Sequence, residues 1–265
     1  AADNSVTWSV DAVAGGNATV GTISAGGVYS AGTALGAHTV KATSVADPAQ
    51  NASATVTVVA APTAAFTPSS YRTVGDTGVV ESGSVQSGVT YAWTLSGNTA
   101  GNNGAITSGA ATSSVTFDAG TPAGTFDLGL TVTNAAGTAD VANHTVTVVA
   151  APVATSLAST FATVLNGDTV TLTPTFSNGT GQIGTSGSGS SQVTGSATSG
   201  NGVLSPAITG STTFTLTVTN LAGATATSTA TVANGATTYA TSASSLFAER
   251  QRHSAVSLSD GTVLI

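Results

Sequence analysis

The most regular feature of the sequence is an alternation of apolar residues with threonine or serine. Residues 52–58 read Ala-Ser-Ala-Thr-Val-Thr-Val, and Leu-Thr-Val-Thr occurs at residues 130–133 and again at 216–219. Side chains of a β-strand point to opposite faces in turn, so this two-residue period predicts strands with one face toward a core. No window carries apolar residues at helical spacing, so we expect no helix longer than about two turns.

Turn signals separate these runs at short intervals. Each Leu-Thr-Val-Thr run continues into Asn-x-Ala-Gly, ending at Gly137 or Gly223, and a second alternating run follows. Asn and Gly tolerate the positive φ that a tight turn needs, so each pair of runs predicts a β-hairpin. A third hairpin is predicted from residues 38–44 and 52–58, joined through Asp47-Pro48. Short strands at such spacing are typical of β-sandwiches.

The sequence also repeats at the length of a small domain. The heptapeptide Val-Thr-Val-Val-Ala-Ala-Pro occupies residues 56–62 and again residues 146–152. Proline cannot donate a ladder hydrogen bond, so strands should stop at Pro62 and Pro152. We therefore predict four segments: an incomplete sandwich at 1–61, complete sandwiches at 62–151 and 152–233, and a linker with a hairpin segment at 234–265.

Single large residues are expected at the centre of each core. Thr-Trp-Ser-Val places Trp8 on a strand, and Ala-Trp-Thr-Leu places Trp93 on its counterpart in the second unit. An indole at such a strand position is expected to be buried, and a carbohydrate platform is the alternative. The expected core aromatic residues are Trp8 and Tyr29 in the first unit, Trp93, Phe117 and Phe126 in the second, and Phe176 and Phe214 in the third.

The strand with its tryptophan, the Asn-x-x-Gly hairpin and the closing Val-Thr-Val strand together resemble bacterial immunoglobulin-like and polycystic-kidney-disease-like modules of secreted surface proteins. The resemblance covers residues 1–233. It implies an all-β chain of three tandem immunoglobulin-like β-sandwiches, located outside the cell at a bacterial surface. The third unit departs from the pattern, because it lacks the tryptophan and contains a stretch rich in Gly and Ser at residues 179–202.

The start of the sequence departs from the repeat. Between Pro62 and Trp93 there is room for two strands, at residues 64–67 and 77–84, whereas seven residues precede Trp8. The first sandwich should therefore lack its two opening strands. An unpaired strand is a template for another chain, so an exposed edge is expected here. The predicted acceptor edge for assembly consists of Val6, Trp8 and Val10.

The C-terminal segment carries a surplus hairpin. Asp260-Gly261 is a strong signal for a tight turn between two short strands. The order Arg-His-Ser-Ala, Leu, Asp-Gly and Val-Leu-Ile along residues 252–265 resembles the opening of a kelch-type propeller blade. As a strand donor to a neighbouring chain, the segment would use Arg252, His253, Val256, Leu258, Val263, Leu264 and Ile265.

Charge and composition exclude several classes of function. Charged residues make up 6% of the chain, against about a quarter in an ordinary domain. Four cationic side chains are too few to neutralise nucleic-acid phosphates. The sequence has no Cys, which excludes disulfides and thiol chemistry, and no apolar run long enough to span a membrane. It also lacks Met, so we expect a processed chain or an excerpt of a longer one.

No motif for catalysis or cofactor binding is found in the sequence. The serine-hydrolase elbow and the P-loop are absent, and the three histidines fall in different segments. Aspartates such as Asp76 and Asp168 stand singly and are interpreted as turn formers. We therefore expect no enzyme, no cofactor and no metal. O-glycosylation of the many Ser and Thr residues is an alternative to a bare hydroxyl surface. Asn-x-Ser/Thr triplets, which arise by chance in so Thr-rich a chain, begin at Asn17, Asn51, Asn143 and Asn178.

Two functions fit these expectations. The first is a subunit of a bacterial surface filament or matrix fibre, in which the C-terminal hairpin of one chain completes the first sandwich of the next. Such a contact does not close on itself, so its main partner is another copy of the chain. The alternative is a spacer or stalk of a longer secreted protein, with a kelch propeller after residue 265 that carries binding or catalysis. Glycans and other surface proteins are further candidate partners, whereas nucleic acid and membrane insertion are excluded.

Overall fold

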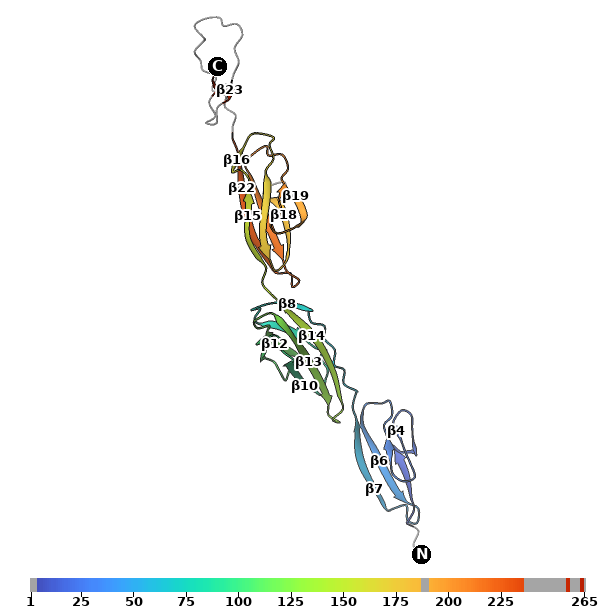
Figure 1. Ribbon diagram of the computed structural model, residues 1–265. Helices are drawn as coiled ribbons and strands as arrows, with labels where there is room; N and C mark the ends of the chain where they lie inside the picture. Colours follow the sequence, from blue (N-terminus) through green and yellow to red (C-terminus); the bar gives the residue numbers. More distant parts are fainter. Residues whose placement is uncertain (1–3, 187–190, 236–255, 258–262, 265) are drawn as a thin grey trace.

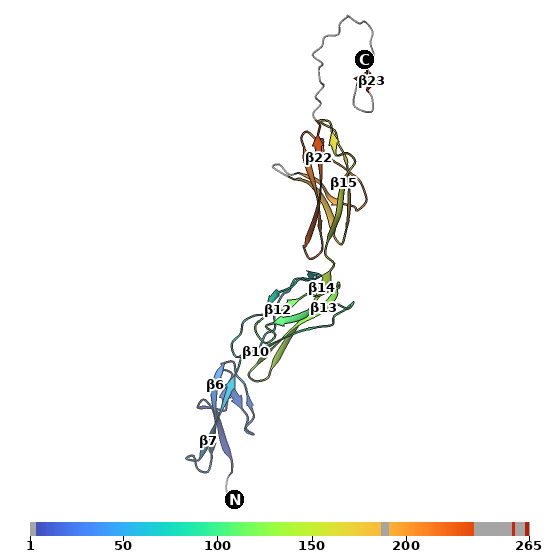
Figure 2. The ribbon, with the colours of Figure 1, turned by 90° about the vertical axis from the view of Figure 1, so that its left-hand side faces the viewer.

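The computed structural model contains β-strands and turns and, over the described residues, no helix. It describes residues 4–186, 191–235, 256–257 and 263–264. The strands form three two-layered sandwiches that lie end to end, and a separate two-stranded hairpin (Figures 1 and 2). The predicted all-β class with tandem immunoglobulin-like sandwiches is confirmed. None of the described residues belongs to a helix that could span a membrane.

The first sandwich consists of two small sheets, with the strand orders β2-β1-β6-β7 and β3-β4-β5. Its core is small: Val10, Ile23 and Val40 are buried, and Trp8 and Tyr29 pack against them. The strands are β1 (Val6–Val10), β2 (Val13–Ala14), β3 (Gly16–Asn17), β4 (Gly21–Ile23), β5 (Tyr29–Ser30), β6 (Gly36–Ser44) and β7 (Asn51–Val58).

The second sandwich has a larger core. Its sheets have the orders β10-β13-β14-β8 and β11-β12-β9. Trp93, Phe117 and Phe126 are buried between them, as the sequence predicts. The two phenylalanine rings meet edge to face, with their centroids 5.7 Å apart. The strands are β8 (Tyr71–Thr73), β9 (Val79–Ser82), β10 (Val89–Ser96), β11 (Ala105–Ser108), β12 (Ser114–Asp118), β13 (Gly124–Asn134) and β14 (Ala139–Val149).

The third sandwich has one sheet with the order β15-β17-β20 and one with the order β16-β22-β21-β18-β19. Phe214 is buried in its core and Phe176 packs against that core, again as predicted. The stretch rich in Gly and Ser contributes β18 and β19. The strands are β15 (Val153–Ser159), β16 (Thr163–Val164), β17 (Thr171–Ser177), β18 (Thr180–Ser186), β19 (Gln192–Ala197), β20 (Val203–Leu204), β21 (Thr212–Thr219) and β22 (Thr225–Asn234).

A three-stranded unit recurs in all three sandwiches. By sequence and by position in the sheet, β1-β6-β7 corresponds to β10-β13-β14 and to β18-β21-β22. In the second and third sandwiches a short strand also runs parallel to the last strand of this unit, because β8 pairs with β14 and β16 pairs with β22. In the described part of the chain no strand lies beside β7 in this way. Among the described residues, the first sandwich therefore has no counterpart of β8 or β16.

One predicted strand of the second sandwich is wrong. The prediction for residues 77–84 corresponds to β9, but residues 64–67 form no strand. The apolar pattern there has another cause, since Phe66 is buried against Trp93 with ring centroids 4.8 Å apart. The backbone N–H of Ala64 donates to a carboxylate oxygen of Asp140 at 2.7 Å, so a side chain takes the place of a sheet ladder. The apolar residues within 64–67 therefore indicate burial against the core and not hydrogen bonding in a sheet.

Candidate functional sites

The strand with Trp8 is not an open edge where the sequence predicts one. β1 lies between β2 and β6, and Val10 pairs with Val13 of β2. The carbonyl of Trp8 accepts a hydrogen bond from the backbone N–H of Gly15 at 2.9 Å. Val10 is also fully buried. The acceptor edge predicted at Val6, Trp8 and Val10 is therefore covered from Trp8 onward, because the chain turns back and supplies its own neighbouring strand.

An open edge lies on the far side of the same sheet, along β7. In the second sandwich, the N–H of Thr147 on β14 donates to Ser70 O at 2.9 Å, and Val149 O accepts a bond from the residue after β8 at 2.9 Å. Thr57 and Val59 occupy the same positions of the repeated heptapeptide in the first sandwich. Among the described residues no strand lies beside them on this side. β7 thus offers an edge that its two counterparts have filled.

The indole of Trp8 also lacks a partner that its counterpart in the second sandwich has. Its Nε1 is buried and has no hydrogen-bond partner among the described residues. The Nε1 of Trp93, at the corresponding strand position, donates to Thr112 O at 2.9 Å. A buried donor without an acceptor costs free energy. The indole donor in the core of the first sandwich is therefore unsatisfied, whereas the corresponding donor in the second is hydrogen-bonded.

The predicted donor segment is described at four residues. β23 (Val256–Ser257) and β24 (Val263–Leu264) form an antiparallel pair, with Val256 opposite Leu264, in the arrangement that the Asp260-Gly261 turn signal predicts. They pair with no other described strand. The turn itself lies outside the described residues, and so do the predicted donor residues Arg252, His253, Leu258 and Ile265.

Asn134 joins the second sandwich to the linker that precedes it. It begins the turn between β13 and β14 and is 8% exposed. Its Oδ1 accepts the backbone N–H groups of Ala136 and Thr138 at 3.1 and 3.0 Å, which fixes the turn. Its Nδ2 donates to the linker carbonyl of Ala60 at 2.9 Å. One side chain thus holds the turn and the linker together.

Asn220 repeats this arrangement at the next junction. Its Oδ1 accepts the backbone N–H groups of Ala222 and Ala224, both at 3.0 Å. Its Nδ2 donates to Ala150 O at 3.0 Å, at the same position of the repeated heptapeptide as in the first linker. It also donates to Thr73 Oγ1 on β8 at 3.1 Å. The first junction has no counterpart of this last bond, because no described strand of the first sandwich corresponds to β8.

Sequence reasoning missed this role of the two asparagines. The Asn-x-x-Gly pattern sufficed to predict the hairpins, since Asn side chains commonly bond their own backbone in turns. An Asn that accepts two such bonds with Oδ1 still has two N–H donors, and a linker carbonyl is a matching acceptor. The signal in the sequence is the joint recurrence of the turn and the Val-Val-Ala-Ala-Pro linker in the same two units.

An ion pair connects β6 of the first sandwich to the turn that follows β1. The Nδ1 of His38 on β6 lies 2.7 Å from Oδ2 of Asp11, and its Nε2 lies 3.0 Å from the carbonyl of Ala34. A carboxylate and a carbonyl can each only accept, so both contacts are hydrogen bonds at the same time only when the ring is an imidazolium. The hydrogen bond to Asp11 raises the pKa of His38. The same bond, together with one from the N–H of Thr39, lowers the pKa of Asp11.

The stability of the first sandwich should therefore depend on pH. The pKa of His38 is raised on folding, so its contribution is complete below the ordinary value of 6.5 and is lost as the pH rises through the folded value. The lowered pKa of Asp11 acts in the opposite sense: its contribution is complete above 3.8 and is lost as the pH falls through the folded value. We measure stability as the urea concentration at the unfolding midpoint of this sandwich, monitored by the NMR signals of β6. We expect this midpoint to fall as the pH rises through the folded pKa of His38.

The variant Asp11→Asn provides the control for this pH dependence. It removes the carboxylate that raises the pKa of His38, so the alkaline fall in the urea midpoint should become much smaller. The measurement has to report on the first sandwich alone, because the second sandwich contains a histidine of its own, His144 on β14. An undiminished alkaline fall in the variant would mean that the pair is not its cause.

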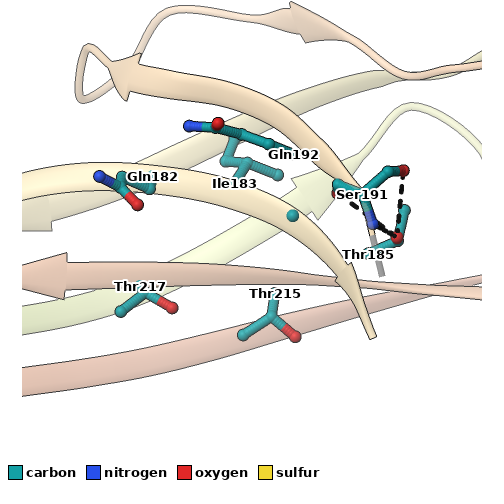
Figure 3. Close-up of a pocket in the computed structure, with 8 residues that line it drawn as sticks. Gln182, Ile183, Thr185, Ser191, Gln192, Thr215 and Thr217 are labelled. Atoms are coloured by element: carbon teal, nitrogen blue, oxygen red, sulfur yellow. Dashed lines mark hydrogen bonds between the residues drawn. The ribbon is translucent and has the colours of Figure 1, made fainter. Parts of the chain in front are cut away.

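A polar hollow of about 340 Å3 lies on the outer face of the third sandwich (Figure 3). Three adjacent strands form it, since β18 provides Gln182 and Gly184, β19 provides Gln192, and β21 provides Thr215 and Thr217. Amide and hydroxyl groups surround it together with Ile183, and none of the described residues that line it is charged. Sequence analysis did not single out these residues, because they are distinguished by their cross-strand register rather than by a motif.

Other candidate residues have structural roles. Asp76 Oδ2 accepts the N–H of Thr73 at 2.9 Å and Asp168 Oδ2 accepts the N–H of Leu165 at 3.1 Å, in line with their interpretation as turn formers. Trp93 is 4% exposed, which rules out the alternative that it forms a carbohydrate platform. Within the described ranges, no group of three or more His, Cys, Asp or Glu residues is placed to hold a metal ion.

Comparison with known proteins gives a likeness of fold. No family model matches the sequence, and no curated protein matches it significantly. Extracellular domains 3–5 of Drosophila OTK are similar at 13% identity and a TM-score of 0.43, over 88% of this chain and 87% of that one. Fibronectin(III)-like modules of Clostridium thermocellum CbhA are similar at 13% identity and a TM-score of 0.41, over 65% of this chain and 94% of that one. Titin domains I67–I69 (E-to-A variant) are similar at 14% identity and a TM-score of 0.38, over 87% and 88%. By its own topology, the chain is a tandem array of immunoglobulin-like β-sandwiches.

Proposed function

We propose that the chain is an extracellular structural spacer of a bacterial surface protein. The observation that carries this proposal is the repeated clamp at the junctions, where Asn134 and Asn220 tie each following sandwich to the linker before it. Domains joined by small interfaces move relative to one another by default. A bond from a buried side chain to the linker opposes such motion, so the array keeps whatever is attached at its two ends apart.

The location and the attached group are further parts of the proposal. The resemblance of the tryptophan strand and its hairpin to modules of secreted surface proteins supports a location outside the cell. A kelch-type unit that begins within residues 252–265 is the group that such a spacer would carry. The intact mass of the native protein tests this part. A mass far above 25.2 kDa supports a carried unit, and a mass near that value removes it.

Small-angle X-ray scattering of the whole chain tests the spacer proposal. We expect a single extended shape whose maximum dimension does not change with ionic strength, because the clamps consist of neutral hydrogen bonds. Scattering that requires a broad ensemble of bent shapes would contradict the proposal.

Assembly into a homopolymer by strand complementation is the second candidate function, and the open edge of β7 favours it. A strand running parallel to β7 beside Thr57 would take the place that β8 has in the second sandwich and β16 in the third. It would satisfy the N–H of Thr57, which corresponds to a bonded N–H on β14. The proposed donor is residues 252–265 of a neighbouring chain, since main-chain ladder bonds give affinity and alternate side chains give specificity.

Sedimentation velocity over a range of concentrations tests this second function. The whole chain should associate, and deletion of residues 252–265 should abolish association. Thr57→Pro should do the same, because proline removes the N–H that the incoming strand needs and is tolerated on an edge strand. Association of Thr57→Pro at the level of the unmodified chain would show that β7 is not the acceptor, and association of the deletion variant would show that the hairpin is not the donor.

A further inference from the structure

The polar hollow of the third sandwich arises from one missing side chain. Ile183 is fully buried in the core, so its neighbours Gln182 and Gly184 lie on the outer face of β18. Across the sheet, Gly184 is opposite Thr215 on β21 and opposite Gln192 on β19. The residues opposite it on the two neighbouring strands, Gln192 and Thr215, carry side chains, and Gly184 leaves a gap between them. The hollow is therefore a defined place in an otherwise continuous polar face.

Backbone geometry does not require a glycine at this position. The φ of Gly184 lies outside the left-handed region that favours glycine. A Cβ added there would meet one backbone atom, Ser191 O, at an ordinary contact distance of 3.4 Å. The register shifts between β18 and β19 beside Gly184, but such a shift needs glycine only where φ is left-handed. Glycine inside a strand weakens it and often marks the close approach of a ligand or another backbone.

The groups around the hollow suit one kind of ligand. The side-chain amides of Gln182 and Gln192 form no hydrogen bond with the residues that the structure describes, so each offers a donor and an acceptor. The hydroxyl of Thr217 offers both as well, and the hydroxyl of Thr215, which shares a hydrogen bond with Ser186 Oγ at 2.7 Å, retains an acceptor. Among the described lining residues there is no cationic side chain to hold an anion and no carboxylate to hold a cation. A ligand rich in neutral hydroxyl groups, each both donor and acceptor, matches this set.

One wall of the hollow is fixed before any ligand arrives. The N–H of Ser191 donates to Thr185 Oγ1 at 2.8 Å, and the N–H of Thr185 donates to Ser191 O at 2.9 Å (Figure 3). These two bonds hold the start of β19 against the end of β18. A preformed wall lowers the ordering cost of binding. None of the described lining residues is aromatic, so weak binding at millimolar concentration is expected.

We propose that this hollow binds a sugar unit of a neutral oligosaccharide or polysaccharide, with Gly184 at its floor and the amides of Gln182 and Gln192 as its main hydrogen-bonding groups. The spacer would thereby attach laterally to a neutral glycan through its third sandwich. The proposal does not depend on the spacer function, because it concerns one face of one sandwich.

NMR titration of the whole chain with cellohexaose, maltohexaose and laminarihexaose tests the proposal. At least one of these neutral glucans should cause saturable shifts of the side-chain amide signals of Gln182 and Gln192. Gly184→Thr fills the hollow with a strand-compatible side chain and should weaken binding about tenfold or more. Gln192→Ala should weaken binding without filling the hollow, while Thr225→Val, at the far end of the same face, should leave it unchanged.

Two outcomes would overturn the proposal. One is the absence of saturable shifts with all three glucans at millimolar concentration. The other is equal binding by Gly184→Thr and the unmodified chain, provided that the backbone spectrum shows the variant to be folded. If Gly184→Thr does not fold, Gln192→Ala decides the matter, since its side chain lies on the surface. The scattering experiment on the spacer is independent of this result.

Discussion

Replacing Trp93 with alanine should lower the free energy of unfolding of the second sandwich by about 3–5 kcal/mol. Its ring is buried and packs edge-on against Phe66, with the centroids 4.8 Å apart. Truncation also leaves Thr112 O without the bond from Nε1 that it accepts at 2.9 Å. The neighbouring core side chains are held in two close-packed sheets and cannot move far enough to fill an indole-sized hole. Since domains are stable by about 5–15 kcal/mol, this loss is a large part of the total.

Native-state amide hydrogen exchange in β13 measures this loss within the whole chain. Trp93→Phe should retain part of the packing and give an intermediate loss. Thr94→Ala changes the exposed neighbour on the same strand and should alter stability by at most about 0.5 kcal/mol. A loss below about 1 kcal/mol in Trp93→Ala would be incompatible with a central place for this side chain in the core.

Replacing Asn220 with aspartate should loosen the second junction while leaving the turn in place. A carboxylate oxygen can still accept the N–H groups of Ala222 and Ala224. It cannot donate to Ala150 O or Thr73 Oγ1, and in place of a donor it presents a second acceptor to the linker carbonyl. Because this position is 7% exposed, the unpaired charge adds a desolvation cost. The bonds lost amount to about 1–3 kcal/mol.

Spin labels on either side of the junction measure this effect. The sequence has no Cys, so cysteines introduced at the exposed positions Val141 and Thr227 are the two labelling sites. Pulsed dipolar spectroscopy should give a narrow distance distribution for the unmodified junction and a broad one for Asn220→Asp. A distribution as narrow as that of the unmodified junction would show that other contacts hold the sandwiches in place.

Two further substitutions separate the turn from the junction. Asn220→Ala removes both functions of the side chain, so it should broaden the distribution and also destabilise the third sandwich. Asn134→Asp, measured with labels across the first junction, should have a smaller effect, because Asn134 has no partner corresponding to Thr73.

The strands and cores could be predicted from the sequence because burial alternates locally along a strand. The runs ending at Asn134 and Asn220 and the burial of Trp93 all follow from this period. The partner of a strand edge depends on residues far away in the chain or on unusual backbone conformations. β2 covers β1 because Asp11 and Ala12 adopt positive φ, a conformation that is uncommon for residues other than glycine. The predicted acceptor edge was therefore placed on β1, whereas the open edge is on β7.

The sites were less predictable than the fold because each depends on distant elements. The bond between Asn220 and Thr73 joins positions in different sandwiches, and no short motif contains both. Gly184 is one of many glycines in the chain, and its importance follows only from Gln192 and Thr215 on the strands to either side. The ion pair of Asp11 and His38 likewise joins a turn to the third strand along its sheet.

The position of the clamp has a consequence for how such a chain can change in length. Asn134 binds the linker in front of its own sandwich, so residues 60–149 contain both a domain and the joint that fixes its entry. Tandem duplication of this stretch would create another joint of the same kind, since Ala150 follows it as Ala60 follows the first sandwich, and the copied Thr73 would be available to the next asparagine. Gene duplication could thus lengthen the array one domain at a time without any compensating substitution at the new boundary.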